Sequence, residues 1–392
     1  MKYPSQRNIP NGLRQHGKLL PVSLLVLLVT CGVLTFYYET WLGREVTVEV
    51  NQSLERVTSH AKGLLVEEIS QYKRNLLFLH ATPPIDGLTR ARANDGIDPF
   101  DGTSSDQWKY RFETIFVSML QNNPEIDQLR VIDINDDGME LIRVDKLSGK
   151  IEIVGEQGLQ PKSDTDYFKS ASNLHPQELY ISQINLNREF GKLVFPYQPT
   201  IRLATPIFYE DGRRFGFVIM NVDASILLTR FRKQAESEFE AVLTDDEGFY
   251  IYHPLENLRF SRDLDPSRKW DGDYQSQVDN NDTQGRFTEL ATGKRFLVHH
   301  EQIRLNTDDR ASLNLYAMAS MDVIGDLMWK RRATTYGFVV VVLLILLVIL
   351  FLLQRSYRSK LQLSETRAEY EAIINGSSDA IIGMDLSGQI TS

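Results

Sequence analysis

In the sequence LRVIDINDDGMELIRVD, residues 129–145, two apolar runs flank the acidic segment DINDDG. This segment matches the first half of a calcium-binding EF-hand loop, but the twelfth position, which would have to be a glutamate, is Val144. The flanking runs have the composition of strands, whereas an EF-hand has helices there. Asp, Asn and Gly are also the residues that tight turns select. We therefore predict a β-hairpin and no metal site.

The same arrangement of an apolar run, a polar turn with glycine and a second apolar run occurs twice more. It recurs in AVLTDDEGFYIYHP, residues 241–254, and in AIIGMDLSGQITS, residues 380–392. Three such hairpins indicate related sheet domains. Chance recurrence of a common turn is the alternative that the pattern alone leaves open.

Helical periodicity surrounds the first hairpin. Apolar residues recur at helical spacing through residues 44–80, which predicts a long amphipathic helix ended by Pro83-Pro84. A polar loop is expected at residues 91–107 and a second helix at 108–121. Residues 193–223 read as strands around the turn Glu-Asp-Gly at 210–212, and 223–239 as a helix.

Two segments, residues 19–38 and 334–353, contain no charged residue and are each long enough to cross a bilayer as a helix. The first is followed by FYYE rather than by small residues, which favours an uncleaved anchor over a signal peptide, and the bulky Val29 and Thr30 disfavour a lipoprotein site at Cys31. Basic residues precede the first segment and follow the second, so both ends are predicted in the cytoplasm.

Composition argues against several classes of function. The net charge of -9, without a basic tract outside the membrane flanks, argues against nucleic-acid binding. The sequence has no P-loop, G-x-G-x-x-G, G-x-S-x-G or H-E-x-x-H motif, and we therefore predict no catalytic domain, cofactor or metal within this chain. His299 and His300 are neighbours on a predicted strand, so they face opposite sides and are expected at the surface.

Residues 39–333 resemble the double Cache sensor domain of bacterial transmembrane receptors. The resemblance is carried by the first two hairpins, DYF at 166–168, YIS at 180–182, PTIRLATPIF at 199–208 and GFVIMNVD at 216–223. It implies an α+β fold with two PAS-like antiparallel sheets on a long N-terminal helix, flanked by two transmembrane helices. The tail, residues 373–392, resembles the first strands of a cytoplasmic PAS domain, and the chain is therefore expected to be the N-terminal part of a longer receptor.

The resemblance also implies a domain order. The predicted parts are a cytoplasmic N-terminus (1–18), transmembrane helix 1 (19–38), a membrane-emergent helix (39–82), a membrane-distal Cache domain (83–230), a membrane-proximal Cache domain (231–333), transmembrane helix 2 (334–353), a signalling helix (354–372) and the start of the PAS domain (373–392).

The function that this resemblance implies is signal transduction. We expect a two-pass receptor of the bacterial inner membrane, a homodimer, whose periplasmic domain binds a small solute and shifts the membrane helices that lead to a cytoplasmic PAS and output module. A sensor histidine kinase is the favoured output; a methyl-accepting chemoreceptor or a diguanylate cyclase is the alternative. A membrane-anchored structural or adhesion module without ligand is the third reading.

The ligand-binding residues implied by the resemblance lie in the membrane-distal domain. They are Tyr167, Tyr180, Ser182, Arg202 and Asp223. An arginine would clamp a carboxylate, an aspartate would pair with an ammonium, and tyrosines would stack or donate. Relatives that bind amino acids have R-x-W-Y where this chain has TDYF, which argues against an α-amino acid. Taken singly, each tyrosine could be a core aromatic and Arg202 a structural ion pair. Arg130 and Arg143 are weaker candidates, expected to be solvated on an outward strand face.

Overall fold

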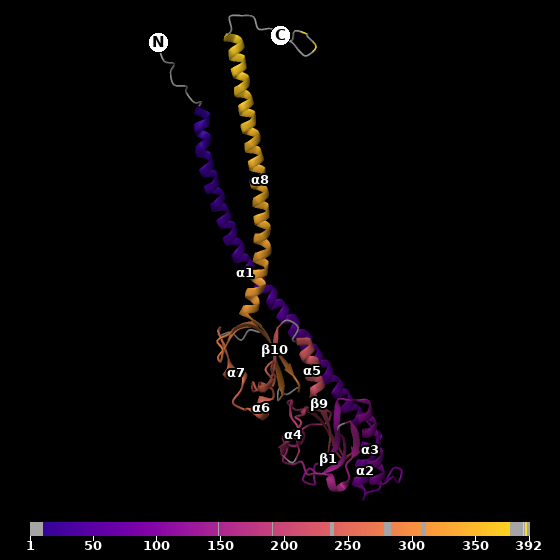
Figure 1. Cartoon of the computed structure of the whole chain (residues 1–392). Coiled ribbons are helices and arrows are strands. Elements are labelled where there is room, and N and C mark those ends of the chain that lie inside the picture. The colour runs from indigo at the N-terminus through magenta and orange to yellow at the C-terminus, as the bar shows by residue number, and fades with distance from the viewer. Residues whose placement is uncertain are drawn as a thin grey trace. The chain divides into compact units, whose positions relative to one another are not determined.

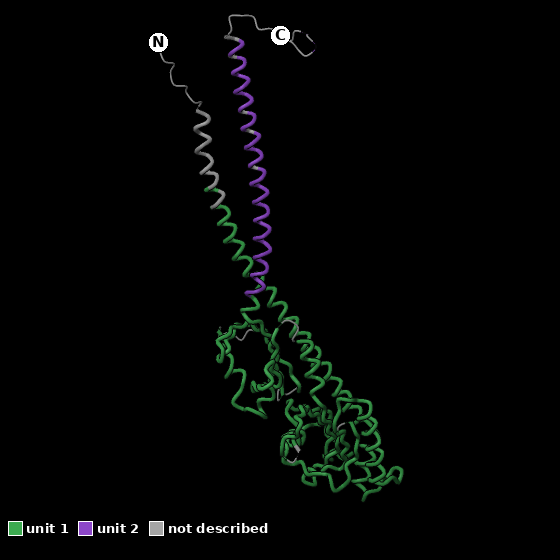
Figure 2. The backbone as a smooth tube through the Cα atoms, in the orientation of Figure 1, with its two compact units in different colours: residues 1–324 green, residues 325–392 purple. Residues whose placement is uncertain are grey.

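The computed structural model describes residues 11–147, 149–189, 191–235, 239–277, 284–306 and 311–376, with Ser387 and Gln389. The chain divides into two compact units, Met1–Ile324 and Gly325–Ser392, which are described separately (Figure 2). The third predicted hairpin, in residues 380–392, lies outside the described residues apart from Ser387 and Gln389, so it stays a prediction.

The long helix α1 (Asn11–His80) runs along the first unit (Figure 1). Ala61, Leu65, Ile69, Tyr72 and Leu76 follow one another every three or four residues and are all buried in the core. This stripe is the one that the helical periodicity predicts. The structure therefore confirms the amphipathic helix, which is continuous with the helical residues of the first apolar segment.

Two shorter helices follow α1. The helix α2 (Pro83–Ala93) is not expected from the sequence, in which the proline pair indicates only the end of a helix. Proline at the first positions of a helix removes no hydrogen bond, so Pro83-Pro84 ends one helix and begins the next. The helix α3 (Ser105–Asn122) begins with a capping box between Ser104 and Gln107.

The first sheet has seven strands in the order β3-β2-β1-β9-β8-β4, with β5 also paired to β8. Its strands are β1 (Ile126–Asp133), β2 (Glu140–Leu147), β3 (Lys150–Ile153), β4 (Tyr180–Ile181), β5 (Asn185–Leu186), β8 (Pro199–Phe208) and β9 (Arg214–Asp223). The strands β1 and β2 form the predicted antiparallel hairpin. Asp137 and Gly138 adopt left-handed φ angles of 48° and 68° at its turn, as Asp and Gly in a tight turn do.

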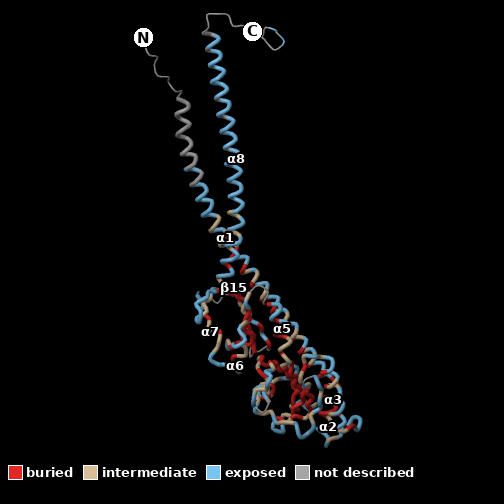
Figure 3. The backbone as a smooth tube through the Cα atoms, in the orientation of Figure 1, coloured by how far each residue is buried: buried red, intermediate tan, exposed pale blue. Residues whose placement is uncertain are grey.

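The two faces of the first sheet differ in chemistry. Leu129 and Val131 point to the core that contains α1 and α3, whereas the alternate residues Gln128 and Arg130 point to the opposite face. The chain between β3 and β8 covers this opposite face. It contains η1 (Glu156–Gly158), α4 (Asp166–Ala171) and the two-stranded sheet of β6 (Arg188–Glu189) and β7 (Lys192–Leu193). Both strand faces are therefore buried, as Figure 3 shows for the interior of the first unit.

The helix α5 (Ala224–Ala235) leads into a second sheet with the order β11-β10-β15-β14-β13-β12. Its elements are β10 (Glu240–Asp245), β11 (Tyr250–Tyr252), η2 (Glu256–Leu258), α6 (Ser261–Leu264), α7 (Trp270–Asp273), β12 (Tyr274–Ser276), β13 (Gln284–Glu289), β14 (Arg295–Arg304) and β15 (Ser312–Ser320). The strands β10 and β11 are the second predicted hairpin, with Gly248 at a φ of 85°.

The histidine pair on β14 differs from the prediction. The two rings do face opposite sides, but neither lies at the surface. His299 is buried, with its Nδ1 2.8 Å from the Thr58 hydroxyl of α1. His300 stacks on Tyr316 at 4.6 Å between ring centres. Helix packing on one face of β14 and an aromatic cluster on the other cover positions that the strand pattern alone leaves exposed.

The helix α8 (Met321–Gly376) contains the second predicted span, residues 334–353, and the predicted signalling helix, residues 354–372, in one element. Among the residues that the structure describes, it is the one helix whose length and apolar composition suit a membrane crossing. Residues 19–38 are helical within α1, but the side chains of residues 19–24, 27 and 28 fall outside the described set, so the first crossing stays a prediction.

Candidate functional site

A cavity of about 460 Å³ lies on the polar face of the first sheet. Four of the five predicted site residues, Tyr167, Tyr180, Ser182 and Arg202, line it together. Asp223 does not line this cavity. Its carboxylate accepts a hydrogen bond of 2.8 Å from the backbone N–H of Ser225 and so caps the start of α5.

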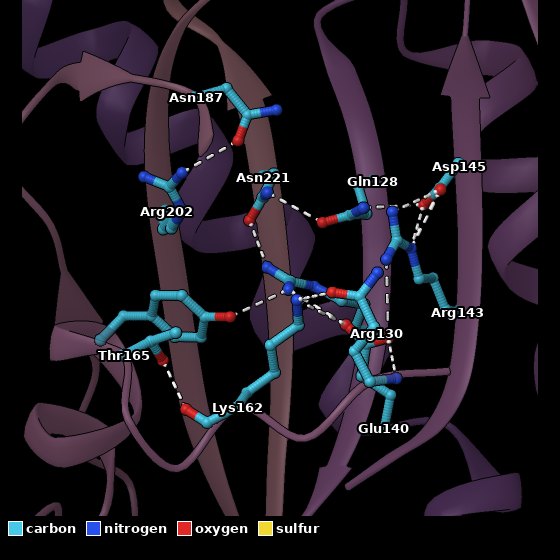
Figure 4. A network of polar contacts seen from close by, with 12 residues as sticks. Gln128, Arg130, Glu140, Arg143, Asp145, Lys162, Thr165, Asn187, Arg202 and Asn221 are labelled. Carbon is cyan, nitrogen blue, oxygen red and sulfur yellow. Dashed lines mark hydrogen bonds and ion pairs between the residues drawn. The ribbon is translucent and has the colours of Figure 1, made fainter. Parts of the chain in front are cut away.

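The centre of the cavity wall is Arg130, which from the sequence alone is only a weak candidate for ligand binding. Its guanidinium donates to the Tyr167 hydroxyl at 3.0 Å and to the Asn221 side-chain oxygen at 2.9 Å (Figure 4). It also contacts Glu140 at 3.3 Å. Arg130 is only 3% exposed, so the expectation of a solvated strand arginine is wrong. The segment between β3 and β8 covers this face, which makes the arginine part of an internal polar network.

The carboxylate of Glu140 balances several cations. It is fully buried and lies 3.3 Å from Arg130, 3.6 Å from Arg143 and 3.8 Å from Lys162. Arg143 was also expected to be solvated, but it is buried and forms an ion pair of 2.8 Å with Asp145. Arg130 and Arg143 stand directly opposite each other in the hairpin register. Two like charges in that position require counter-charges on the same face, and the carboxylates at 140 and 145 provide them.

Arg202 is fixed by amides. Its two terminal nitrogens donate to Asn185 at 2.7 Å and to Asn187 at 3.1 Å. Its backbone N–H donates to the Ser182 hydroxyl at 2.9 Å, which explains the position of that serine in the wall. Two of the groups that hold the Arg202 guanidinium are therefore neutral amides, which fix its orientation in the cavity wall without cancelling its charge.

Tyr167 lies between the two arginines. The guanidinium carbons of Arg130 and Arg202 are 5.3 and 5.8 Å from its ring centre, within the range of cation–π attraction. Burial alone would raise the pKa of the Tyr167 phenol, but the nearby charges of Arg130 and Lys162 outweigh burial and lower the pKa below its ordinary value. The cavity thus has an excess of positive charge at its inner wall.

Two acidic residues, Asp164 and Asp166, also line the cavity, but they are exposed at its edge. The inner cations Arg130, Arg202 and Lys162 outnumber the one fully buried inner carboxylate, Glu140. A buried site with excess cationic donors is chemically suited to an anion, above all to a planar carboxylate that two donors can hold at once.

On the second sheet, stacked aromatic rings cover the face of the strands. Trp270 stacks on Tyr316 at 3.7 Å and on Tyr274 at 4.4 Å between ring centres. With His300 against Tyr316, four rings form one continuous stack in this domain. Large aromatic rings therefore occupy space in the second domain where the first has polar groups around a cavity.

Comparison with known proteins supports a sensory role. Residues 94–272 match the family model of the bacterial histidine kinase, sensor domain. Over these residues the chain is similar to the sensor domain of bacterial histidine kinases. The match includes the whole wall of the cavity, from Gln128 to Asn221. The comparison with curated proteins finds no matching relative.

The fold of the sensor domain is similar to solved structures. One is a domain of a protein described as a sensory box/GGDEF family protein from Vibrio parahaemolyticus, with 19% identity, a TM-score of 0.55 and coverage of 71% of this chain and 99% of that chain. Another is the extracellular domain of a protein described as the histidine kinase vpHK1S-Z8, with 19% identity, a TM-score of 0.54 and coverage of 72% and 94%. The periplasmic sensory domain of the Campylobacter jejuni chemoreceptor Tlp1 is also similar, with 13% identity, a TM-score of 0.44 and coverage of 70% and 94%.

Proposed function

We propose that this chain is the input part of a two-pass receptor in the bacterial inner membrane, whose periplasmic sensor domain binds a small carboxylate-bearing solute. The observation that carries the proposal is the cavity wall in which Arg130, Arg202 and Lys162 surround the ring of Tyr167. One further donor, Nε of Arg130, is buried and has no hydrogen-bond partner among the described residues. A buried guanidinium N–H without a partner favours an anionic ligand that can accept its hydrogen bond.

The wall of the cavity also contacts the second domain, which provides a route for a signal. Asn185 and Asn187 hold Arg202, and Leu186 between them donates its backbone N–H to the Asp263 carboxylate of α6 at 2.8 Å. Arg188 forms an ion pair of 2.9 Å with the same carboxylate. A ligand that draws Arg202 away from its amides would displace this segment and thereby the contact with Asp263.

Signalling then requires that the ligand prefer one of two arrangements of the receptor, since differential affinity is the only means by which binding can shift an equilibrium. We propose that the receptor acts as a homodimer and that α8 carries the shift through the bilayer to a PAS and output module. The match to a histidine kinase sensor domain favours a histidine kinase as that output. Catalysis would belong to the output module and not to the sensor domain.

A binding experiment tests the ligand class. The chain in lipid nanodiscs is titrated with glutarate and with uncharged glutaramide, and the thermal midpoint of unfolding is measured. Glutarate is expected to raise the midpoint, because a ligand of the folded state stabilises it by about 2.7 kcal/mol at a hundredfold excess over Kd. Glutaramide is expected to have no effect.

Two arginine variants localise the binding. Arg202→Gln removes a cavity cation, whereas Arg213→Gln removes the exposed arginine at the β8–β9 turn. Glutarate binding should be lost in the first variant and kept in the second. Failure of glutarate to stabilise the wild-type protein, or equal binding by both variants, would refute a carboxylate site at this cavity.

A further inference from the structure

A second cavity, of about 370 Å³, lies beside the first on the same face of the first sheet. Gln128, Gln160, Asn187 and Asn221 line both cavities and form the wall between them. Within this wall Asn221 donates to the Gln128 side-chain oxygen at 2.9 Å. None of the residues predicted to bind the ligand of the first cavity lines the second.

The two cationic side chains of the second cavity, Arg143 and Lys146, are already held by oxygen atoms of the protein. Arg143 is held by the Asp145 carboxylate at 2.8 Å and lies 3.6 Å from Glu140. The ammonium group of Lys146 donates to the backbone oxygens of Leu120 and Asn123, at 3.2 and 2.8 Å, near the end of α3. Carbonyl groups at a helix C-terminus attract a cation, so this lysine is fixed there and not directed at a ligand.

The carboxylate of Asp127, in contrast to these cations, has no protein partner within the described residues. It lines the second cavity and forms no hydrogen bond or ion pair with any residue that the structure describes. Its position follows from an irregularity in the sheet. Ile126 pairs with Val222 of β9 and Gln128 with Asn221, so Asp127 is an extra residue in a β-bulge. Bulges redirect side chains next to functional sites, and here the bulge leaves a carboxylate at the cavity wall.

The surroundings of Asp127 are short of positive charge. Burial and the neighbouring Asp223 raise the pKa of Asp127 to about 7, and only Lys146 opposes them. Glu152 adds a further carboxylate to the cavity lining. A cation placed beside Asp127 would therefore be stabilised chiefly by the Asp127 carboxylate. The amide and hydroxyl oxygens of Gln198 and Thr200 could accept its N–H groups.

We propose that the second cavity is a separate binding site for a small organic ammonium ion, with Asp127 as its counter-ion. This site is distinct from the carboxylate site, but the two share the Gln128–Asn221 wall. A cation that reorients these amides changes the partners of Arg130, because Asn221 accepts a hydrogen bond from that arginine. Occupation of one cavity therefore alters the affinity of the other, and by linkage the effect is reciprocal.

The test uses n-propylammonium chloride as the probe. The full chain in lipid nanodiscs is titrated with it at millimolar concentrations and matched ionic strength, and binding is followed by the thermal midpoint and by calorimetry. Tetramethylammonium, which has the charge but no N–H donor, and n-propanol, which has a similar shape but no charge, are the controls. We expect binding of n-propylammonium, at least tenfold weaker binding of tetramethylammonium and none of n-propanol.

Two matched variants assign the site. Asp127→Asn should weaken n-propylammonium binding roughly tenfold or more, because a charge-assisted hydrogen bond is lost. Asp223→Asn removes a neighbouring charge but keeps a side chain that caps α5, and it should change the affinity by less than about threefold. Equal effects of the two variants, or no binding by the wild-type protein, would overturn the proposal.

A third variant separates the two sites. Arg202→Gln, which should abolish glutarate binding, is expected to leave n-propylammonium binding intact, because Arg202 lines only the first cavity. Loss of n-propylammonium binding in this variant would show a single shared site and refute a separate one. Absence of glutarate binding alone would refute the carboxylate site and leave the ammonium site standing.

Discussion

Replacement of Glu140 by glutamine should destabilise the sensor domain more than any other single loss of charge in its polar network. The carboxylate is fully buried and faces three cations within 4 Å, at 3.3 Å for Arg130, 3.6 Å for Arg143 and 3.8 Å for Lys162. Breaking a buried ion pair by removing one partner typically costs about 3–5 kcal/mol. Arg130 keeps Asn221 and Arg143 keeps Asp145, so we expect the lower end, about 3 kcal/mol.

For a domain of roughly 150–250 residues, this loss corresponds to a fall of roughly 6–12 °C in the midpoint of thermal unfolding. Circular dichroism of the chain in nanodiscs measures it. Glu152→Gln is the matched control, because Glu152 is an exposed residue of β3 and its loss should change stability by no more than about 0.5 kcal/mol.

The same substitution should act on ligand binding with the opposite sign. The first cavity of Glu140→Gln has one more uncompensated positive charge, so the affinity for glutarate should rise while the stability of the unliganded protein falls. If Glu140→Gln unfolds within about 2 °C of Glu152→Gln, the carboxylate does not hold these cations together and the reasoning fails.

Three further predictions concern packing, coupling and pH. Gly216→Ala should severely lower the midpoint of thermal unfolding, because a Cβ there would lie 1.9 Å from the backbone oxygen of Ile132 in β1. Gly155→Ala is the control and should leave the midpoint unchanged, because there is open space around Gly155. Asp263→Ala should keep the Kd for glutarate but reduce the signalling output of the complete receptor. Asp265→Ala, which removes an exposed charge nearby, should leave both unchanged, and an unaltered output in Asp263→Ala would disprove the route. Burial and a nearby carboxylate raise the pKa of Asp127 from 3.8 to about 7, so the folded state binds more protons than the unfolded state between these pH values. The stability of the protein should therefore fall as pH rises from about 4 to 7. Asp127→Asn should remove this pH dependence, and an unchanged pH dependence in the variant would contradict the raised pKa of Asp127.

Local patterns in the sequence are sufficient for the elements that depend on local physics. The turn residues of the first hairpin demand left-handed backbone at Asp137 and Gly138, and the structure has it there. The apolar stripe on α1 and the uncharged run within α8 are likewise properties of continuous stretches of chain. Tyr180, Ser182 and Arg202 of the predicted site do meet at one cavity, because strand alternation places them on a common face. Tyr167 joins them from the helix α4.

Tertiary structure alone decided how each charged strand residue is used. Whether Arg130 and Arg143 are solvated or buried depends on the segment between β3 and β8, which is distant in sequence and covers their face. The bulge that turns Asp127 to the second cavity arises from pairing with β9, nearly a hundred residues later by the strand register. Asp223, at the end of that strand, is instead committed to the first turn of α5. Strand alternation specifies which side a residue faces, but burial and electrostatic environment follow from what packs on that side, and this requires contacts between segments far apart in the chain.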